Sequence, residues 1–228
     1  MNNLKKMAAA RAVEAVRSRM VLGLGTGSTA RYVVEMIGER LSDGRLHDIV
    51  GVPTSSETER LARHVGIPLT TLQQHPVLDL TIDGADEIGP GLVLIKGQGG
   101  ALLREKIVAR ASRQEIIAGD ESKLVQVLGT RSPLAVEVIP FGWPTYEQAL
   151  RNLGCEAVLR LDPVGDEPFL TDEHNYIVDC HFARIDDPAA LERELNSITG
   201  VVENGLFVGL ATRAFVASPS GVTELLPH

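Results

Sequence analysis

The sequence is poor in aromatic residues and in positive charge. Its 228 residues include five Phe, three Tyr and one Trp, and 22 Lys and Arg stand against 30 Asp and Glu, so the formal net charge is −8. Nucleic-acid-binding proteins normally carry a basic patch, and single-strand binders stack bases on aromatic rings. We therefore expect neither nucleic acid nor an anionic membrane surface as a partner. A small anionic ligand remains compatible with this composition, because a local site can be positive on an acidic protein.

Cysteines and long hydrophobic runs are also scarce. The two cysteines, Cys155 and Cys180, have no CxxC partner and no His at metal-ligand spacing, so we expect two reduced, buried thiols and no metal site. No run approaches the roughly 20 apolar residues of a membrane span. The segment 1–20 lacks the apolar core of a signal peptide, and its apolar residues recur at helical spacing. These absences predict a cytoplasmic protein without membrane spans.

Short apolar runs alternate with helical patterns in the first half of the chain. Strands are expected at 20–24, 49–52, 78–82, 92–95 and 115–118, and helices at 28–40, 55–65 and 101–112. Continuous apolar strands separated by helices are typical of a parallel sheet that is covered on both faces. The first half therefore predicts an α/β domain.

The pattern changes after residue 129. Strands at 135–139, 157–161, 176–180 and 200–202, with helices at 145–153 and 188–198, give the order of a split βαβ, ferredoxin-like domain. We predict an α/β domain from residues 1–129 and 205–228 with a smaller α+β domain, 130–204, inserted in it. The strands expected at 206–210 and 214–217 would return to the first domain.

A glycine-rich turn, Gly23–Thr29, follows the first strand and opens a helix. Its backbone N–H groups and the positive end of the helix dipole favour a phosphate group. It is neither a Walker A loop nor a complete dinucleotide motif, because no Lys follows the last glycine and Ser28 and Ala30 stand where the third glycine would be. A plain turn with a Ser or Thr cap is the alternative. The segment Thr54–Glu57 fits a capping box better than a ligand site.

Charged residues follow other strand ends. Asp83 and Asp86 come directly after the third strand, where open α/β sheets bind ligands. Lys96 precedes a glycine-rich turn, and Glu105 lies one turn into the next helix, where the dipole favours a carboxylate that could serve as a base. Lys123 could clamp a phosphate. The alternatives are a capped turn, an exposed glutamate in a first helical turn and a solvated lysine.

Taken together, these segments resemble the ribose-5-phosphate isomerase type A family. The matching segments run in order from about residue 5 to 225: GLGTGST, VPTSSET, DGADEI, KGQGGALLREKIVA, GDESKLVQVLG, PLAVEVIP and GVVENGLF. The resemblance implies an enzyme of the pentose phosphate pathway that interconverts D-ribose 5-phosphate and D-ribulose 5-phosphate through an enediolate. It also implies a Rossmann-like α/β domain with a smaller α+β domain, a homodimer or homotetramer, and neither a metal nor an organic cofactor.

The resemblance also implies roles for single residues. Glu105 would be the general base between C2 and C1, Lys96 would polarise the carbonyl oxygen, and Asp83 and Asp86 would act in ring opening and on the hydroxyl protons. Gln98 stands where many members have Gly, so its side chain must point away from the sugar while the backbone contacts remain. The implied substrate contacts are Thr26, Gly27, Ser28, Thr29, Gly84, Ala85, Gly97, Gln98, Gly99, Lys123 and an N-terminal lysine, Lys5 or Lys6.

Two kinds of alternative remain. A sugar-phosphate deaminase or a coenzyme A transferase could share such a fold, the transferase using its glutamate as a nucleophile. A sugar-phosphate sensor module would be expected beside a helix-turn-helix domain and could dispense with a base. The Lys96-to-Glu105 spacing and the DGADE segment favour the isomerase.

Overall fold

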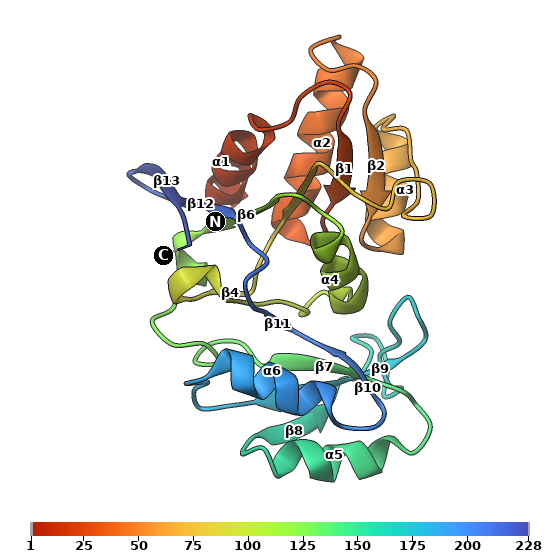
Figure 1. Cartoon of the computed structure of the whole chain (residues 1–228), viewed down its shortest axis with the longest axis vertical. Helices are drawn as coiled ribbons and strands as arrows, with labels where there is room; N and C mark the ends of the chain where they lie inside the picture. The colour runs from red at the N-terminus through yellow and green to blue at the C-terminus, as the bar shows by residue number, and fades with distance from the viewer. Residues whose placement is uncertain (1, 228) are drawn as a thin grey trace. The chain divides into compact units, whose positions relative to one another are not determined.

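The computed structural model describes residues 2–227 and divides into two compact units (Figure 1). Unit 1 consists of Met1–Ala85, Arg104–Leu124 and Gly209–His228, and unit 2 consists of Asp86–Leu103 and Val125–Val208. The predicted inserted domain, 130–204, lies within unit 2. The structure adds 86–103, 125–129 and 205–208 to it. The first and last of these segments supply strands that pair with one another, and Leu128 forms an isolated bridge with Ile185.

Unit 1 is built on a six-stranded sheet with the order β13-β12-β6-β3-β1-β2. Only the edge pair β12–β13 is antiparallel. The strands are β1 (Val21–Leu24), β2 (Val50–Pro53), β3 (Leu80–Asp83), β6 (Glu115–Asp120), β12 (Arg213–Ser218) and β13 (Gly221–Leu225). The α/β prediction is confirmed, as is the return of the chain to this unit near 214–217, whereas β13 was not predicted.

Helices cover both faces of this sheet, as continuous apolar strands require. The helices of unit 1 are α1 (Asn2–Val13), α2 (Ser28–Ser42), α3 (Ser56–His64) and most of α4 (Leu102–Arg110). Leu22 and Leu24 of β1 pack in one core with α1 and α2, while the alternate residue Val21 packs in a second core with Val108 of α4. The carboxyl ends of the strands and the amino ends of the helices are thereby brought to the same edge of the sheet.

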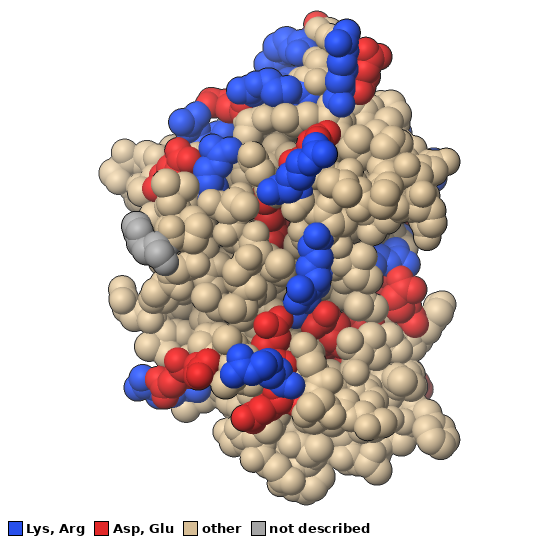
Figure 2. Space-filling model, viewed as in Figure 1, with Lys and Arg blue, Asp and Glu red and all other residues tan. Residues whose placement is uncertain are grey.

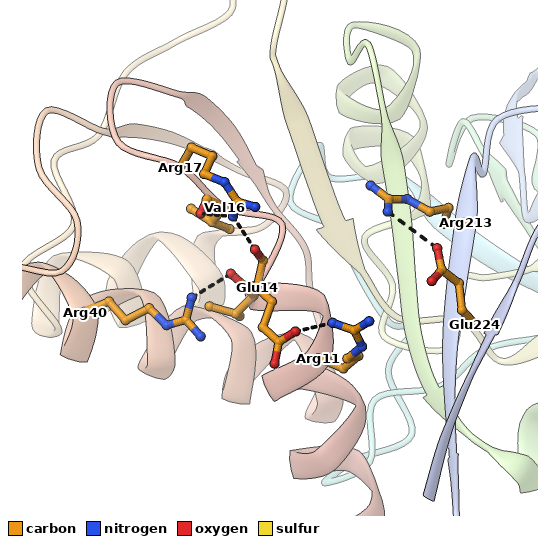
Figure 3. Close-up of polar contacts among 8 residues, drawn as sticks. Arg11, Glu14, Val16, Arg17, Arg40, Arg213 and Glu224 are labelled. Carbon is orange, nitrogen blue, oxygen red and sulfur yellow. Dashed lines mark hydrogen bonds and ion pairs between the residues drawn. The ribbon is translucent and has the colours of Figure 1, made fainter.

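Arginines close the carboxyl end of α1 (Figure 3). Arg40 Nη1 of α2 donates to the carbonyl of Val13 at 2.9 Å, and Arg17 Nη1 donates to the carbonyls of Glu14 and Val16. These carbonyls lie at and just beyond the negative end of the helix, where a guanidinium is favourable. The same close-up shows Arg213 and Glu224 paired across β12 and β13 at 3.5 Å. The Arg40 contact ties α1, the helix that bears Lys5, to α2 within unit 1.

Unit 2 contains a four-stranded antiparallel sheet with the order β10-β7-β9-β8. Its elements follow the chain as β7 (Leu134–Val138), α5 (Trp143–Arg151), β8 (Glu156–Leu159), β9 (Tyr176–His181), α6 (Pro188–Asn196) and β10 (Val201–Asn204). This is the predicted split βαβ arrangement. Residues of α5 and α6 join one core with alternate residues of β7 and β9, so the intervening residues, Ala135, Glu137, Ile177 and Asp179, face the other side of the sheet.

A second, three-stranded antiparallel sheet in unit 2 corrects two expectations. It contains β4 (Glu87–Ile88), β5 (Leu94–Ile95) and β11 (Leu206–Phe207), in the order β11-β5-β4. The run 92–95 is therefore not a strand of the parallel sheet. The strand expected at 206–210 is confined to Leu206–Phe207 and belongs to unit 2, which the chain leaves at Gly209. A short buried strand has the same apolar composition in the parallel sheet of unit 1 as in the antiparallel sheet of unit 2. The sequence of such a strand therefore does not reveal which sheet it joins.

Both cysteines of unit 2 are free and buried, as predicted. A hydrogen bond with Cys155, together with burial, raises the pKa of the Cys180 thiol.

Within residues 2–227, every helix is too short or too polar to reach across a bilayer.

Candidate active site

The turn between β1 and α2 is tied to the rest of unit 1 by a cluster of buried hydroxyl groups. Thr26 Oγ1 lies 2.7 Å from Thr54 Oγ1 and 2.8 Å from Ser55 Oγ, and 3.1 Å from Thr58 Oγ1. Thr58 Oγ1 in turn donates to the carbonyl of Gly25 at 2.9 Å. The side chain of Thr26 is thus engaged by its own protein, and it positions the turn through neutral hydrogen bonds.

The Thr54–Glu57 segment caps a helix, although one residue later than predicted. Ser55 is the N-cap of α3, and its Oγ accepts from the backbone N–H of Thr58 at 3.0 Å. The residue three positions after the cap is therefore Thr58 and not a glutamate. Glu57 is exposed in the first turn of α3, where the helix dipole favours its charge.

Asp83 ends β3 with its carboxylate buried, at 1% exposure. Its Oδ1 accepts from the backbone N–H groups of Thr26 at 3.0 Å and Gly84 at 2.7 Å. A Cβ at position 25 would come within 2.6 Å of the Cα of Asp83, so only glycine allows this approach between the two strand ends. The glycine-rich turn and the Asp83 loop are therefore brought together as predicted.

The amino end of α2 carries the predicted phosphate-binding group of unit 1. Gly27 and Ser28 are exposed there, and Lys5 Nζ of α1 donates to Ser28 Oγ at 2.8 Å, whereas Thr29 is buried. A cation, a hydroxyl and the positive end of a 15-residue helix are thus combined at one point. Of the two lysines that the sequence left open, Lys5 is the one in contact with this turn.

Glu105 lies in the first turn of α4 and is 5% exposed. The alternative of an exposed surface glutamate is therefore wrong, and the carboxylate has the low exposure that a base needs for an effective proton transfer. Lys123, in the short 3-10 helix η2 (Glu121–Lys123) that follows β6, is half-buried.

In unit 2, Lys96 follows β5 and is 2% exposed. Its backbone N–H donates to the carbonyl of Gly205 at 2.9 Å, and its Nζ lies 5.4 Å from the centre of the Phe207 ring. In a region of low dielectric constant, the effect of a protonated lysine on a nearby oxyanion would be large.

The turn after Lys96 is bonded to Asp86 within the same unit. The backbone N–H of Gln98 donates to Asp86 Oδ2 at 3.0 Å, and both Gln98 and Gly99 are exposed. Sequence reasoning missed a further contact of this turn: Arg160 Nη1 donates to the carbonyls of Gly97 and Gln98. No local pattern points to an arginine about 60 residues away, because the contact depends on how β8 is placed in the sheet.

Each unit therefore holds one group of candidate residues. Unit 1 joins Thr26 to Asp83 and Lys5 to Ser28, and unit 2 joins Asp86 to the Lys96–Gly100 turn. Within residues 2–227, no cluster of three or more His, Cys, Asp or Glu side chains could hold a metal ion.

Comparison with known proteins identifies the family. The sequence model of ribose 5-phosphate isomerase A (phosphoriboisomerase A) matches residues 50–221. Ribose-5-phosphate isomerase A of Roseiflexus castenholzii is 54% identical over 97% of this chain and 94% of its own, and that of Chloroflexus aurantiacus is 56% identical over 97% and 92%. A structure of a D-ribose-5-phosphate isomerase in complex with phospho-erythronic acid superposes with a TM-score of 0.96 at 43% identity, covering 98% of both chains. The chain belongs to the ribose 5-phosphate isomerase A family.

Proposed function

We propose that this chain is an aldose–ketose isomerase that interconverts D-ribose 5-phosphate and D-ribulose 5-phosphate. The observation that carries the proposal is its match, over nearly the whole length, to proteins named ribose-5-phosphate isomerase A. The neighbouring structure in complex with phospho-erythronic acid, a phosphorylated four-carbon acid, supports a sugar-phosphate substrate. The buried carboxylate of Glu105 and the buried cation of Lys96 are the residue types that this reaction needs.

The reaction moves one proton between neighbouring carbons. We assign Glu105 to remove the proton from C2 of the open-chain aldose, which places negative charge on O1 and forms an enediolate. Lys96 stabilises this charge, and Glu105 returns the proton to C1. The O2 hydroxyl loses its proton as the C2 carbonyl forms, and O1 gains one. Asp83 and Asp86 handle these hydroxyl protons and the opening of the furanose ring.

The phosphate group is held away from the reacting carbons. We assign it to Lys5, Ser28 and the amino end of α2, with Lys123 as a further cation. Backbone contacts with the rest of the substrate are assigned to Gly27, Gly84, Ala85, Gly97, Gln98 and Gly99. Binding energy from a remote phosphate orients the reacting carbons, which accelerates the reaction beyond simple affinity. Thr26 and Thr29, which are buried in this turn, stay among the proposed substrate contacts.

We further propose that the enzyme acts in the cytoplasm as a homodimer and without nucleic acid. The acidic net charge supports the last point, and on the face drawn in Figure 2 basic and acidic side chains lie next to one another rather than in one basic patch. Light scattering of the purified chain at micromolar concentration distinguishes a dimer from a monomer or a tetramer.

Incubation with ribose 5-phosphate in D₂O tests the function directly. We expect ribulose 5-phosphate to form without an added metal, with solvent deuterium appearing on carbon because Glu105 exchanges its proton with water. A protein that binds ribose 5-phosphate without turnover would instead support the sensor alternative. Release of ammonia from an amino-sugar phosphate would support the deaminase.

A further inference from the structure

Arg160 of unit 2 is bonded through its whole guanidinium group. It follows β8, and its Nε and Nη2 donate to the two carboxylate oxygens of Asp179 on β9 at 2.9 Å and 2.5 Å. Its Nη1 donates to the carbonyls of Gly97 at 2.9 Å and Gln98 at 3.1 Å. The two side chains are 14% and 17% exposed, so the pair is better shielded from solvent than the Arg151–Glu147 and Arg184–Asp186 pairs of the same unit.

The ring of Phe169 holds the guanidinium and the turn together. Arg160 Cζ lies 5.8 Å from the centre of that ring, and a Cβ at position 100 would lie 2.5 Å from two of its carbons. The loop that carries Phe169 is fixed in turn by Glu137, whose Oε1 accepts from Thr171 Oγ1 and Asn175 Nδ2 at 2.9 Å each. Every member of this chain of contacts belongs to unit 2.

The Gly97–Gln98 peptide is bonded at both ends. Its carbonyl accepts from Arg160, and its N–H donates to Asp86 Oδ2 at 3.0 Å. In a planar trans peptide the C=O and N–H groups point in opposite directions, and no peptide bond of the described residues is cis. A guanidinium on the carbonyl side therefore orients the N–H toward Asp86 and makes it a stronger donor.

The next peptide is oriented in the same way. Because the carbonyl of Gln98 also accepts from Arg160, the N–H of Gly99 points away from the guanidinium. A lysine could not replace this contact set, since it lacks the planar fork that bonds two carboxylate oxygens and two carbonyls at once.

We propose that Arg160, held by Asp179, is a positioning residue for the reaction. It fixes the two peptides after Lys96 so that their N–H groups face Asp86 and the sugar, and it acts on catalysis through them. The inference rests on the proposed isomerase function. It adds a residue that touches neither the substrate nor the reacting atoms. It also gives the face of the four-stranded sheet opposite α5 and α6 a role in catalysis.

The test compares Arg160→Met and Arg160→Lys with wild type on ribose 5-phosphate. We expect Arg160→Met to lower kcat on the order of 10²-fold, as a misplacement of about 1 Å does, while KM changes less than about threefold because the phosphate is anchored in unit 1. The Arg160→Lys variant should unfold at nearly the wild-type temperature because it keeps the positive charge. Its kcat should be nearly as low as that of Arg160→Met, because lysine lacks the planar guanidinium group. The matched control is Arg184→Met, which removes an exposed Arg–Asp pair of the same unit and should leave kcat unchanged.

A second measurement separates positioning from general stability. If Arg160 acts through the Gly97–Gln98 peptide on Asp86, replacing Arg160 should have a smaller effect on kcat in a variant that already lacks the Asp86 carboxylate. Arg160→Met should therefore lower kcat by a factor about tenfold smaller in an Asp86→Asn background than in the wild-type background, and the remaining loss passes through the Gly99 N–H. Wild-type kcat in both Arg160 variants, or losses that multiply in the double variant, would overturn the proposal. Should Arg160→Met fail to fold, Arg160→Lys and Asp179→Asn provide the same comparison.

The wild-type assay keeps the two hypotheses apart. Absence of turnover by the wild-type chain would reject the isomerase function itself. Turnover by wild type together with unchanged variants would reject only the role of Arg160.

Discussion

The two units hold their candidate residues by different physical means. In unit 1 the side chain of Thr26, in the turn between β1 and α2, is held by the neutral hydroxyl groups of Thr54, Ser55 and Thr58. The Asp83 carboxylate holds only the backbone N–H of that turn. In unit 2 the turn after Lys96 is fixed by charged groups, the Arg160–Asp179 pair. A neutral network is insensitive to pH and salt, whereas a charged network holds its partners more strongly and depends on every member being present.

This contrast assigns different consequences to similar substitutions. In unit 1, replacing a charged residue that does not hold the turn should lower the reaction rate and leave the stability of the fold unchanged. A buried charge of unit 2 should affect stability in a way that depends on pH.

Glu105→Gln should have the largest effect on the reaction. The amide has nearly the shape of the carboxylate but cannot accept the C2 proton, so we expect kcat to fall ~10²–10⁴-fold. The midpoint of thermal unfolding should stay close to that of wild type. Steady-state kinetics and a melting curve on the same sample measure both quantities.

The matched control for Glu105 is Glu57→Gln, which changes an exposed glutamate in the first turn of α3. We expect wild-type kcat for it. If Glu105→Gln retained wild-type kcat, another group would have to be the base, and unit 1 would lose its assigned role in the chemistry.

Lys5→Ala should act on substrate binding. Loss of a charged donor to a phosphate removes about 1.5–3 kcal/mol of binding free energy, so KM should rise roughly 10- to 100-fold with a smaller change in kcat. Lys6→Ala is the matched control, because Lys6 is the exposed neighbour on the same helix. Equal effects of the two substitutions would mean that the contact of Lys5 with Ser28 does not mark the phosphate site.

Thr58→Val should destabilise unit 1 without a dependence on pH. Valine keeps the shape of threonine but leaves the buried carbonyl of Gly25 without its 2.9 Å donor, which costs about 1–3 kcal/mol of the free energy of unfolding. Urea unfolding at pH 5 and pH 8 should give the same loss. The control Thr223→Val, at an exposed position of β13, should change the stability by less than about 0.5 kcal/mol.

The contrast between neutral and charged networks also explains what the sequence could predict. The turns of unit 1 follow strand ends and open helices, so Ser28, Asp83 and Glu105 could be placed from periodicity and capping rules over a few residues. The predicted cap of α3 is wrong by one residue, because Thr54 and Ser55 each carry a hydroxyl group that can cap a helix.

In unit 2 the sequence predicts the helices and strands of the four-stranded sheet, but not which distant segments pair. The order of β7, α5, β8, β9, α6 and β10 follows from local patterns, but the pairing of β5 with β11 joins segments more than 100 residues apart. The contact of Arg160 with Gly97 and Gln98 is of the same kind. Long-range pairing is selected by the free energy of the whole fold, and no window of sequence contains it.

The charge buried in unit 2 gives the last and smallest test. Glu137 is 1% exposed on β7, and burial raises the pKa of its carboxyl above the ordinary value of 4.5, an effect to which Glu173 and Glu203 add and which hydrogen bonds from Asn175 and Thr171 only partly offset. The folded state therefore favours the protonated form. Its contribution to stability is complete below the ordinary pKa and is lost as the pH rises through the raised pKa of the folded protein.

Glu137→Gln removes this titration and keeps an oxygen that can accept from Thr171 and Asn175. The free energy of unfolding of wild type, relative to that of the variant, should therefore fall as the pH is raised from about 4.5 toward 8. Urea unfolding across that range measures it, with Glu156→Gln on the exposed side of β8 as the pH-independent control. A difference between wild type and Glu137→Gln that stays constant with pH would show that the buried carboxyl does not titrate on folding. Unit 2 would then resemble unit 1 in its response to pH, and the contrast between the two networks would rest on Arg160 and Asp179 alone.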